Sequence, residues 1–167
     1  MDSITLDVAG ARVTLPAATL TQLWLDQLHR QAASPPAKPG QPPRIGQPWP
    51  GHGGIYAGTA RGSDGKPDYF LIVADPARDG ITWDKAKDWA KNMLEAGVAD
   101  WNLPTRAEQA LLFANVPELF EKEWYWSGEP YAGDEQFAWF QGFGYGSQRY
   151  YHKLYELRAR AVRREPI

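Results

Sequence analysis

Proline is concentrated in one short stretch of the chain and divides it into parts. Seven of the 14 prolines fall between Pro35 and Pro50 of the 167-residue sequence. Because proline fixes φ and lacks a backbone donor, neither a helix interior nor a central strand can run through such a stretch. The sequence therefore predicts a semi-rigid extended linker over 34–54, preceded by a small module (1–33) and followed by one main domain (55–167).

The first module has the pattern of a β-hairpin followed by a helix. Apolar residues alternate over 4–8 and again over 13–15, on either side of Ala9-Gly10, which predicts two strands and a tight turn. Apolar residues at helical spacing then predict an amphipathic helix over about 17–33. Such a unit is too small to be stable alone, so we expect it to pack on the main domain or to pair copies into a homo-oligomer.

The main domain has two helix patterns between groups of strand patterns. Strands are expected at "GIYAGTA" and "YFLIVAD", and later near 124–127, 137–143, 148–154 and 157–163. One helix is expected over about 82–96, and a second begins with the capping-box pattern Thr105-Arg106-Ala107-Glu108 and stops at Pro117. We predict an α+β fold, with two helices segregated from a mostly antiparallel sheet.

Composition and charge exclude several classes of function. The chain has no cysteine, so disulfides, thiolate metal sites and a cysteine nucleophile are excluded. Its net charge of −2 does not favour nucleic acid. The basic end from Arg158 to Arg164 alternates like a half-exposed strand, and Arg163 and Arg164 are expected to meet acidic residues. No metalloprotease, P-loop or serine-hydrolase motif is present, and the acidic residues near 64–68 and 129–135 are expected to stabilise turns. We therefore expect no enzyme activity, no cofactor and no metal.

The first residues of the chain and its hydropathy give an expectation for where the protein is located. The first ten residues lack the basic and apolar regions of a signal peptide, and no run of about 18 apolar residues is present. We expect no membrane insertion, and a protein that is cytoplasmic as synthesised or associated with a virion.

The aromatic residues gather near the C-terminus. Twelve of the 22 lie between Trp124 and Tyr155. Strand alternation puts Ala138 and Phe140 on one face and Trp139 on the other, and the adjacent Tyr150 and Tyr151 also point to opposite sides. Either both faces are covered and the rings form a two-sided core, or some rings form a recognition surface, since Tyr, Trp and Arg dominate binding hot spots.

Several stretches resemble the Lcl C-terminal (DUF1566) domain family, which is related to C-type lectins and to formylglycine-generating-enzyme-like domains. They are "DWNLPTRAEQALLFANVPELF", "WYWSGE", "FAWFQGFGYGSQ" and "RARAVRR", and the resemblance covers roughly 45–164. It implies a C-type-lectin-like fold in which Trp101, Leu103, Pro104, Trp126 and Val162 are scaffold. The absence of cysteine and of a Trp-Asn-Asp motif argues against formylglycine-generating activity and calcium-dependent sugar binding.

The segment from Phe140 to Glu156 also resembles the variable region of lectin-fold proteins diversified by retroelements. Such regions interleave a regular frame (here Trp139, Gln141, Phe143, Gly146, Gln148 and Lys153) with displayed residues. The resemblance implies these ligand-binding residues: Phe140, Gly142, Tyr145, Ser147, Arg149, Tyr150, Tyr151, His152 and Tyr155.

We therefore predict a phage- or prophage-encoded protein that binds a protein or glycan ligand on a cell surface without covalent chemistry. Three alternatives stay open. The rings could form a permanent subunit interface of an assembly protein, the chain could regulate a host protein inside the cell, or it could be an enzyme of unrecognised chemistry.

Overall fold

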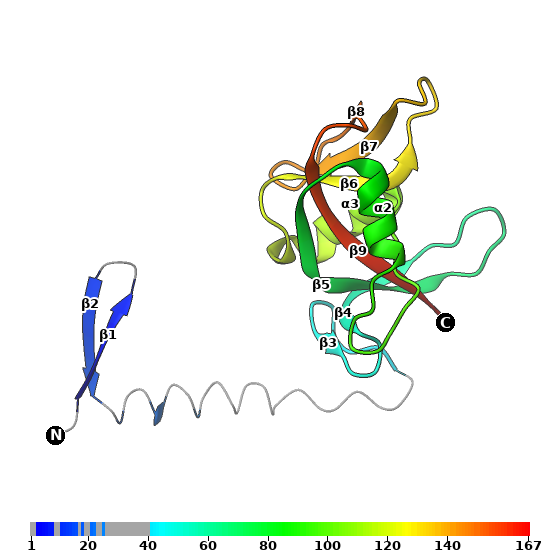
Figure 1. The fold of residues 1–167 in the computed structure, drawn as a ribbon. Coiled ribbons are helices and arrows are strands. Elements are labelled where there is room, and N and C mark those ends of the chain that lie inside the picture. The colour runs from blue at the N-terminus through cyan, green and yellow to red at the C-terminus, as the bar shows by residue number, and fades with distance from the viewer. Residues whose placement is uncertain (1–2, 9–10, 17, 19–20, 23–24, 26–40) are drawn as a thin grey trace. The chain divides into compact units, whose positions relative to one another are not determined.

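The computed structural model of the chain describes residues 3–8, 11–16, 18, 21–22, 25 and 41–167 (Figure 1). The chain divides into two compact units, Met1–Gly40 and Gln41–Ile167. The second unit begins earlier than the predicted boundary at residue 55, because the end of the proline-rich stretch belongs to it. Trp49, which the sequence analysis placed in the linker, is only 6% exposed and packs in the core.

The N-terminal unit contains the predicted hairpin. Strand β1 (Ser3–Val8) pairs antiparallel with β2 (Ala11–Pro16), and the pairing of Val8 with Ala11 leaves a two-residue connection. The hydroxyls of Thr5 and Thr14 lie 3.0 Å apart across the two strands. Most of the predicted helix over 17–33 lies outside the described residues, but its four described positions, Ala18, Thr21, Gln22 and Leu25, are helical.

The second unit is built on one seven-stranded mixed sheet. Its strands are β3 (Pro48–Trp49), β4 (Gly54–Ala60), β5 (Tyr69–Ile81), β6 (Trp124–Pro130), β7 (Phe137–Gly142), β8 (Gln148–His152) and β9 (Leu157–Pro166). Their order in the sheet is β3-β4-β5-β9-β6-β7-β8, and β6 and β9 form its parallel pair. The helices of this unit are α2 (Trp83–Lys91), α3 (Arg106–Asn115) and the 3-10 turn η1 (Pro117–Leu119).

The prediction of an α+β, C-type-lectin-like domain is wrong, because the domain is mostly sheet. The central strands are longer than the sequence patterns indicated: β5 has 13 residues and β9 has 10, and they pair along most of their length. This pairing joins the first strands and the C-terminal strands into one sheet. The predicted segregation of helices from strands does not occur, since α2 and α3 cover the sheet itself.

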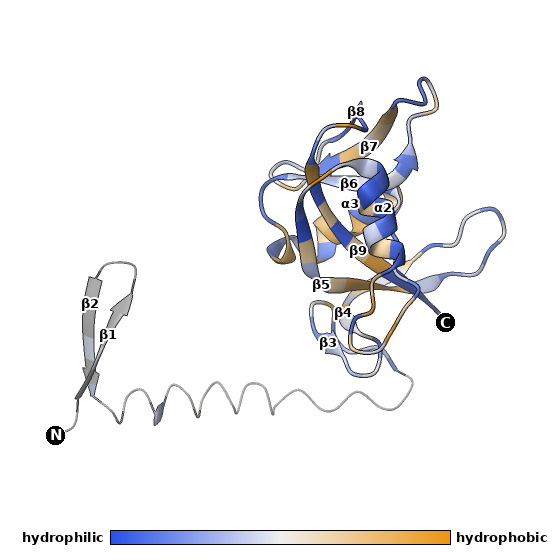
Figure 2. Ribbon diagram, in the orientation of Figure 1, coloured by the Kyte–Doolittle hydropathy of each residue, from blue (hydrophilic) through white to orange (hydrophobic). Residues whose placement is uncertain are grey.

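The two helices pack on opposite faces of the sheet. Ala86 of α2 lies in one hydrophobic cluster with Trp126, whereas Leu112 of α3 lies in another with Tyr125. Adjacent residues of β6 therefore point into different cores, as strand alternation requires. Figure 2 shows hydrophobic colour on stretches of β5 and β9 and hydrophilic colour over much of α2.

Helix α2 is shorter than predicted. It ends at Lys91 rather than near Ala96, and Asn92 has already left helical geometry. Ala96 and Gly97 adopt positive φ values of 49° and 78°, between the paired residues Glu95 and Val98. Such a left-handed two-residue turn cannot be part of an α-helix.

A short extended segment, 102–104, bridges the sheet where β9 and β6 diverge. Those two strands share one pairing, Tyr125 with Arg158. Asn102 exchanges two backbone hydrogen bonds with Val162 of β9 (2.9 and 2.8 Å), and the amide of Gly128 in β6 donates to the carbonyl of Pro104 (2.8 Å). The residues expected to be scaffold, Trp101, Leu103, Pro104, Trp126 and Val162, are all buried.

The predicted capping box forms and is also the centre of a buried ionic network. Glu108 is 1% exposed, and its carboxylate accepts from the Thr105 amide (2.7 Å), the Tyr69 hydroxyl (2.7 Å) and two nitrogens of Arg164 (2.7 and 2.8 Å). Burial lowers the pKa of the Arg164 guanidinium, but the hydrogen bonds and charge of Glu108 outweigh this and raise it overall. Arg163 likewise pairs with Glu165, so Arg163 and Arg164 both meet acidic residues as predicted.

The Tyr69 hydroxyl makes the stability of the domain sensitive to pH in the alkaline range. Burial, and then the Glu108 carboxylate, raise the pKa of Tyr69 from 10.0 to about 12. A pKa that is raised on folding contributes stability that is complete below pH 10 and is lost as the pH rises through about 12. We expect urea unfolding to show that the stability difference between the wild type and Tyr69→Phe shrinks over this range. Tyr145→Phe, at an exposed tyrosine, should leave the wild-type pH dependence unchanged; a constant difference for Tyr69→Phe would contradict the assignment.

Candidate functional site

The hairpin of β7 and β8 carries aromatic rings on both sides. Its register pairs Trp139 with Tyr150 and Ala138 with Tyr151, so neighbouring pairs point to opposite faces of the sheet. On the face that carries α3, five rings gather beyond the helix. We call them the aromatic face: Tyr131, Phe137, Trp139, Tyr150 and His152.

The rings of the aromatic face pack against one another in defined orientations. Tyr131 stacks on Tyr150 with centroids 4.0 Å apart and planes 10° from parallel. Trp139 meets both rings edge-on, at 5.7 and 5.6 Å. Phe137 meets Tyr150 at 6.0 Å and His152 at 5.3 Å. Tyr150 is nonetheless 46% exposed, so this is a surface of mutually supported rings and not a core.

A cation completes the aromatic face. The guanidinium carbon of Arg106 lies 3.6 Å from the centroid of a Trp139 ring, within the range of a cation–π contact. Arg106 is the first residue of α3, and its amide donates to Glu129 Oε1 (2.7 Å). The face therefore offers apolar ring surface, phenol hydroxyls and a positive charge within one small area.

A chain of amide side chains holds α3 to the strands below the face. Gln148 donates to the Arg106 carbonyl (2.6 Å) and to Gln141 Oε1 (2.8 Å). Gln141, which is 1% exposed, donates to the Gln109 carbonyl (3.0 Å), and Gln109 donates to the Tyr125 carbonyl (2.9 Å). Because buried amides need specific partners, this chain fixes the position of the helix relative to the rings.

The opposite side of the hairpin carries a second group of rings. Phe140 is buried there at 4% exposure and packs against Trp124 (5.0 Å). Tyr151 contacts Trp124 at 6.0 Å and Tyr155 at 4.3 Å. Trp124 and Tyr155 are 49% and 54% exposed, so Trp124, Tyr151 and Tyr155 form a smaller, separate exposed cluster.

Comparison with known families assigns the domain. Residues 59–163 match the Lcl C-terminal domain, a stretch that runs from β4 to β9 and contains every ring described above. The chain belongs to the Lcl C-terminal domain family. A search of curated proteins finds no match to the chain. Family membership confirms that part of the resemblance seen in the sequence.

The nine predicted ligand-binding residues do not form one surface in this Lcl C-terminal domain. Tyr150 and His152 belong to the aromatic face, whereas Tyr151 and Tyr155 belong to the cluster on the other side. Tyr145, 96% exposed, and Ser147 lie in the turn between β7 and β8, and Arg149 is exposed on β8.

Two of the nine lie in the interior, and their assignment to the surface is a correction. Phe140 and Gly142 are buried. Phe140 shares its side of β7 with Ala138 and points into the core that contains α2. A Cβ on Gly142 would meet the Trp124 ring at 3.4 Å. The sequence analysis treated the whole segment as displayed, although alternation along β7 had already separated Phe140 from Trp139.

Four residues of the aromatic face were missed. Tyr131 and Arg106 come from a turn and a helix end, and only the tertiary fold brings them to the hairpin. Trp139 was recognised as lying on the face opposite Ala138 but was assigned to the frame, and Phe137 was not assigned to a site. The signal that could have found Phe137 and Trp139 is their position along β7, since both alternate with Ala138 and Phe140 and therefore point to the other face of the strand.

Among the described residues, no group of three or more His, Asp or Glu side chains is placed to hold a metal ion, and no helix is long and apolar enough to cross a membrane. The neighbouring Tyr150 raises the pKa of the Tyr131 hydroxyl above its ordinary value, so the Tyr131 hydroxyl stays protonated and can both donate and accept.

Two matched truncations test the division between core and surface. Phe140→Ala removes a buried ring and should cost about 3–5 kcal/mol of unfolding free energy. Tyr150→Ala removes a half-exposed ring that stacks on one neighbour, and should cost about 1 kcal/mol. Urea denaturation followed by tryptophan fluorescence measures both. Similar losses for the two variants would show that Tyr150 belongs to the core.

Proposed function

We propose that this protein is a noncovalent ligand-binding protein that uses the aromatic face to contact a protein or glycan on a cell surface. The observation that carries the proposal is the half-exposed Tyr131–Tyr150 stack beside Trp139 and Arg106. Tyrosine, tryptophan and arginine dominate binding hot spots because they combine large rigid area with a polar tip. In a monomeric soluble domain, such a group of rings left in water indicates an interaction surface.

The geometry of the rings supports tight binding from a small area. Each ring is already held by a neighbour, so little side-chain entropy remains to be lost when a ligand binds. Arg106 covers one plane of Trp139 and Tyr131 covers one plane of Tyr150, so a ligand would meet the free planes, ring edges and hydroxyls. Gln148 Oε1 accepts from Arg106 Nε (3.3 Å), which holds the guanidinium in place at the edge of the face.

The proposal extends to the source of the protein and to its N-terminal unit. We infer a phage- or prophage-encoded protein in which the hairpin of β1 and β2 attaches the domain to a particle or pairs it with copies. A two-stranded hairpin is marginal on its own, which is the reason to expect a partner for it. Several linked copies would convert weak single sites into high avidity.

A permanent subunit interface is the alternative, and the exposed Trp124–Tyr151–Tyr155 cluster on the other side favours it. In that case the full chain would form one oligomer at all concentrations, and Tyr150→Ala or Tyr155→Ala would dissociate it. A monomer, or an oligomer unaffected by both variants, would remove this alternative. Sedimentation velocity distinguishes these outcomes.

The binding proposal predicts different effects for two exposed tyrosines. Full-length protein would be tested for binding to arrayed bacterial glycans and to intact bacterial cells. Tyr150→Ala should weaken the binding by about ten-fold or more, as expected for a hot-spot residue. Tyr145→Ala, the same change at an isolated ring on the turn, should alter it by less than about three-fold. Equal losses of binding in the two variants would contradict a binding site on the aromatic face. A protein that binds neither the glycans nor the cells would contradict a cell-surface ligand.

A more specific form of the proposal is that a retroelement diversifies this segment, and the fold limits the positions that could vary. Variation is tolerated where side chains are displayed, which applies to Tyr145, Ser147 and Arg149 but not to the buried Phe140 and Gly142. Deep sequencing of the gene across one source population should show substitutions at adenine positions of codons between 145 and 155, with codons 140 and 142 unchanged. An invariant segment would contradict diversification and leave a fixed binding surface.

A further inference from the structure

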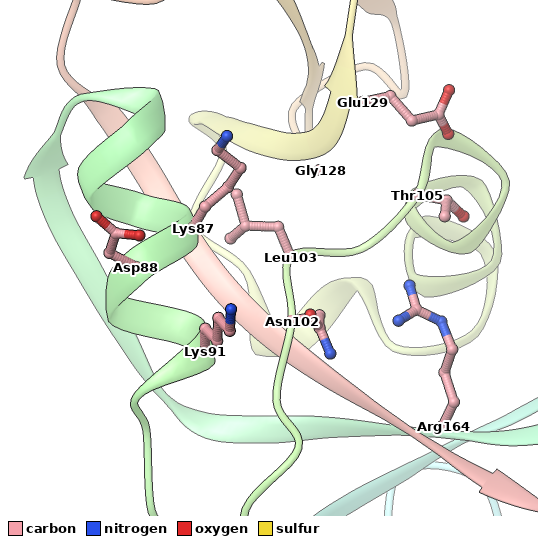
Figure 3. Close-up of a pocket in the computed structure, with 9 residues that line it drawn as sticks. All are labelled: Lys87, Asp88, Lys91, Asn102, Leu103, Thr105, Gly128, Glu129 and Arg164. Carbon is pink, nitrogen blue, oxygen red and sulfur yellow. The ribbon is translucent and has the colours of Figure 1, made fainter.

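A cavity of about 450 Å³, whose lining contains none of the rings of the aromatic face, lies between α2 and α3 (Figure 3). Its walls come from four separate parts of the chain: the last turns of α2, the bridging segment and the start of α3, the end of β6, and β9. Sites for small molecules in proteins have volumes of roughly 300–1,000 Å³, so this cavity is large enough for one.

The cavity follows from the way the sheet is divided. β9 and β6 pair at one position and then diverge, and the backbone of 102–104 forms hydrogen bonds with both strands. The two helices lie on opposite faces of the sheet, and the cavity opens beside this connection between α2 and the start of α3. Leu103, 5% exposed, is an apolar wall, Gly128 adds backbone, and the other lining residues are polar or charged.

The charges directed at the cavity are positive. Lys87 and Lys91 are one helical turn apart on the same side of α2, and Figure 3 shows both extending to the cavity side of the helix. The carboxylate of Asp88, also at the rim, points to the other side of α2 in the same view. Arg164 approaches from β9 opposite them.

The nearby acidic groups are engaged elsewhere. Glu129 Oε1 accepts a hydrogen bond from the Arg106 amide. The Glu108 carboxylate accepts hydrogen bonds from Nε and Nη2 of Arg164. Lys87 is held by two neighbours: its ammonium lies 3.1 Å from Asp84, in an exposed pair that holds it weakly, and 3.6 Å from the centroid of the Trp83 ring. Within residues 41–167, no ion-pair partner is found for Lys91. Lys91 is therefore the charge most available to a ligand, and Lys87 is a second positive charge on the lining.

We propose that this cavity binds a small anionic molecule of about monosaccharide size, with its carboxylate or phosphate group held by Lys87 and Lys91. The Asn102 amide and the Thr105 hydroxyl are placed on the lining to bond a hydroxyl-rich body. The polar lining disfavours an apolar ligand, because buried polar groups would lose water without replacement. The lining carries three cations, Lys87, Lys91 and Arg164, against two carboxylates, Asp88 and Glu129, and this net positive charge favours an anion over its uncharged counterpart.

The test uses three sugars that differ mainly at one carbon. The full-length, isotope-labelled protein is titrated with glucuronate, glucose 6-phosphate and glucose, and amide shifts are followed by NMR. We expect one or both anions to shift the signals of Asn102 and Gly128 in a saturable way below about 20 mM, a concentration well above a millimolar Kd. Glucose should cause no such shift. Binding of glucuronate alone identifies the carboxylate as the recognised group, and binding of glucose 6-phosphate alone identifies the phosphate.

Two lysine variants on the same helix locate the site. Lys91→Gln should weaken anion binding by about ten-fold, the effect of losing one charged contact. Lys85→Gln makes the same change at an exposed position of α2 outside the cavity lining, and should alter binding by less than about two-fold. Equal losses in the two variants, equal binding of glucose, or no shifts with either anion would each overturn the proposal. Tyr150→Ala should leave these titrations unchanged, so the result is independent of the aromatic face.

Discussion

The buried carboxylate of Glu108 is the interaction on which the arrangement of this domain depends. It accepts four hydrogen bonds, from the backbone at the start of α3, from Tyr69 at the start of β5 and from Arg164 near the end of β9. Without Arg164, a carboxylate that is 1% exposed would lie in the interior without a compensating charge, at a cost of several kcal/mol. One residue thus joins the cap of a helix to two central strands.

The position of α3 then determines the two surfaces that carry our proposals. The first residue of the helix, Arg106, lies over Trp139 on the aromatic face, and its cap, Thr105, lines the cavity. The hydrogen bond from the Arg106 amide to Glu129 ties the same turn to the end of β6. The helix start therefore separates two areas of different chemistry: rings and a guanidinium on one side, and lysines with polar groups on the other.

The contrast between these areas follows from how completely the sheet is covered. The β7–β8 hairpin extends past both helices, so rings on each of its faces stay partly exposed. Where β9 and β6 diverge, backbone hydrogen bonds to 102–104 satisfy the strands, but side chains leave a space beside them. An aromatic surface and a polar cavity are both consequences of a large mixed sheet with only two short α-helices in residues 41–167.

Local patterns in the sequence determined the elements of this protein. Alternation located the strands of the N-terminal hairpin and of 124–163, and the Thr105–Glu108 spacing located the start of α3, because these signals depend on residues close in the chain. The fold class, the length of β5 and the partners of Glu108 were decided only by tertiary structure. Tyr69 and Arg164 lie 39 and 56 residues from Glu108, and no local pattern encodes which strands pair across such separations. For the same reason the sequence located an aromatic-rich segment, but only the packed sheet decided that Phe140 is core, that Tyr150 is surface, and that Arg106 and Tyr131 lie beside it.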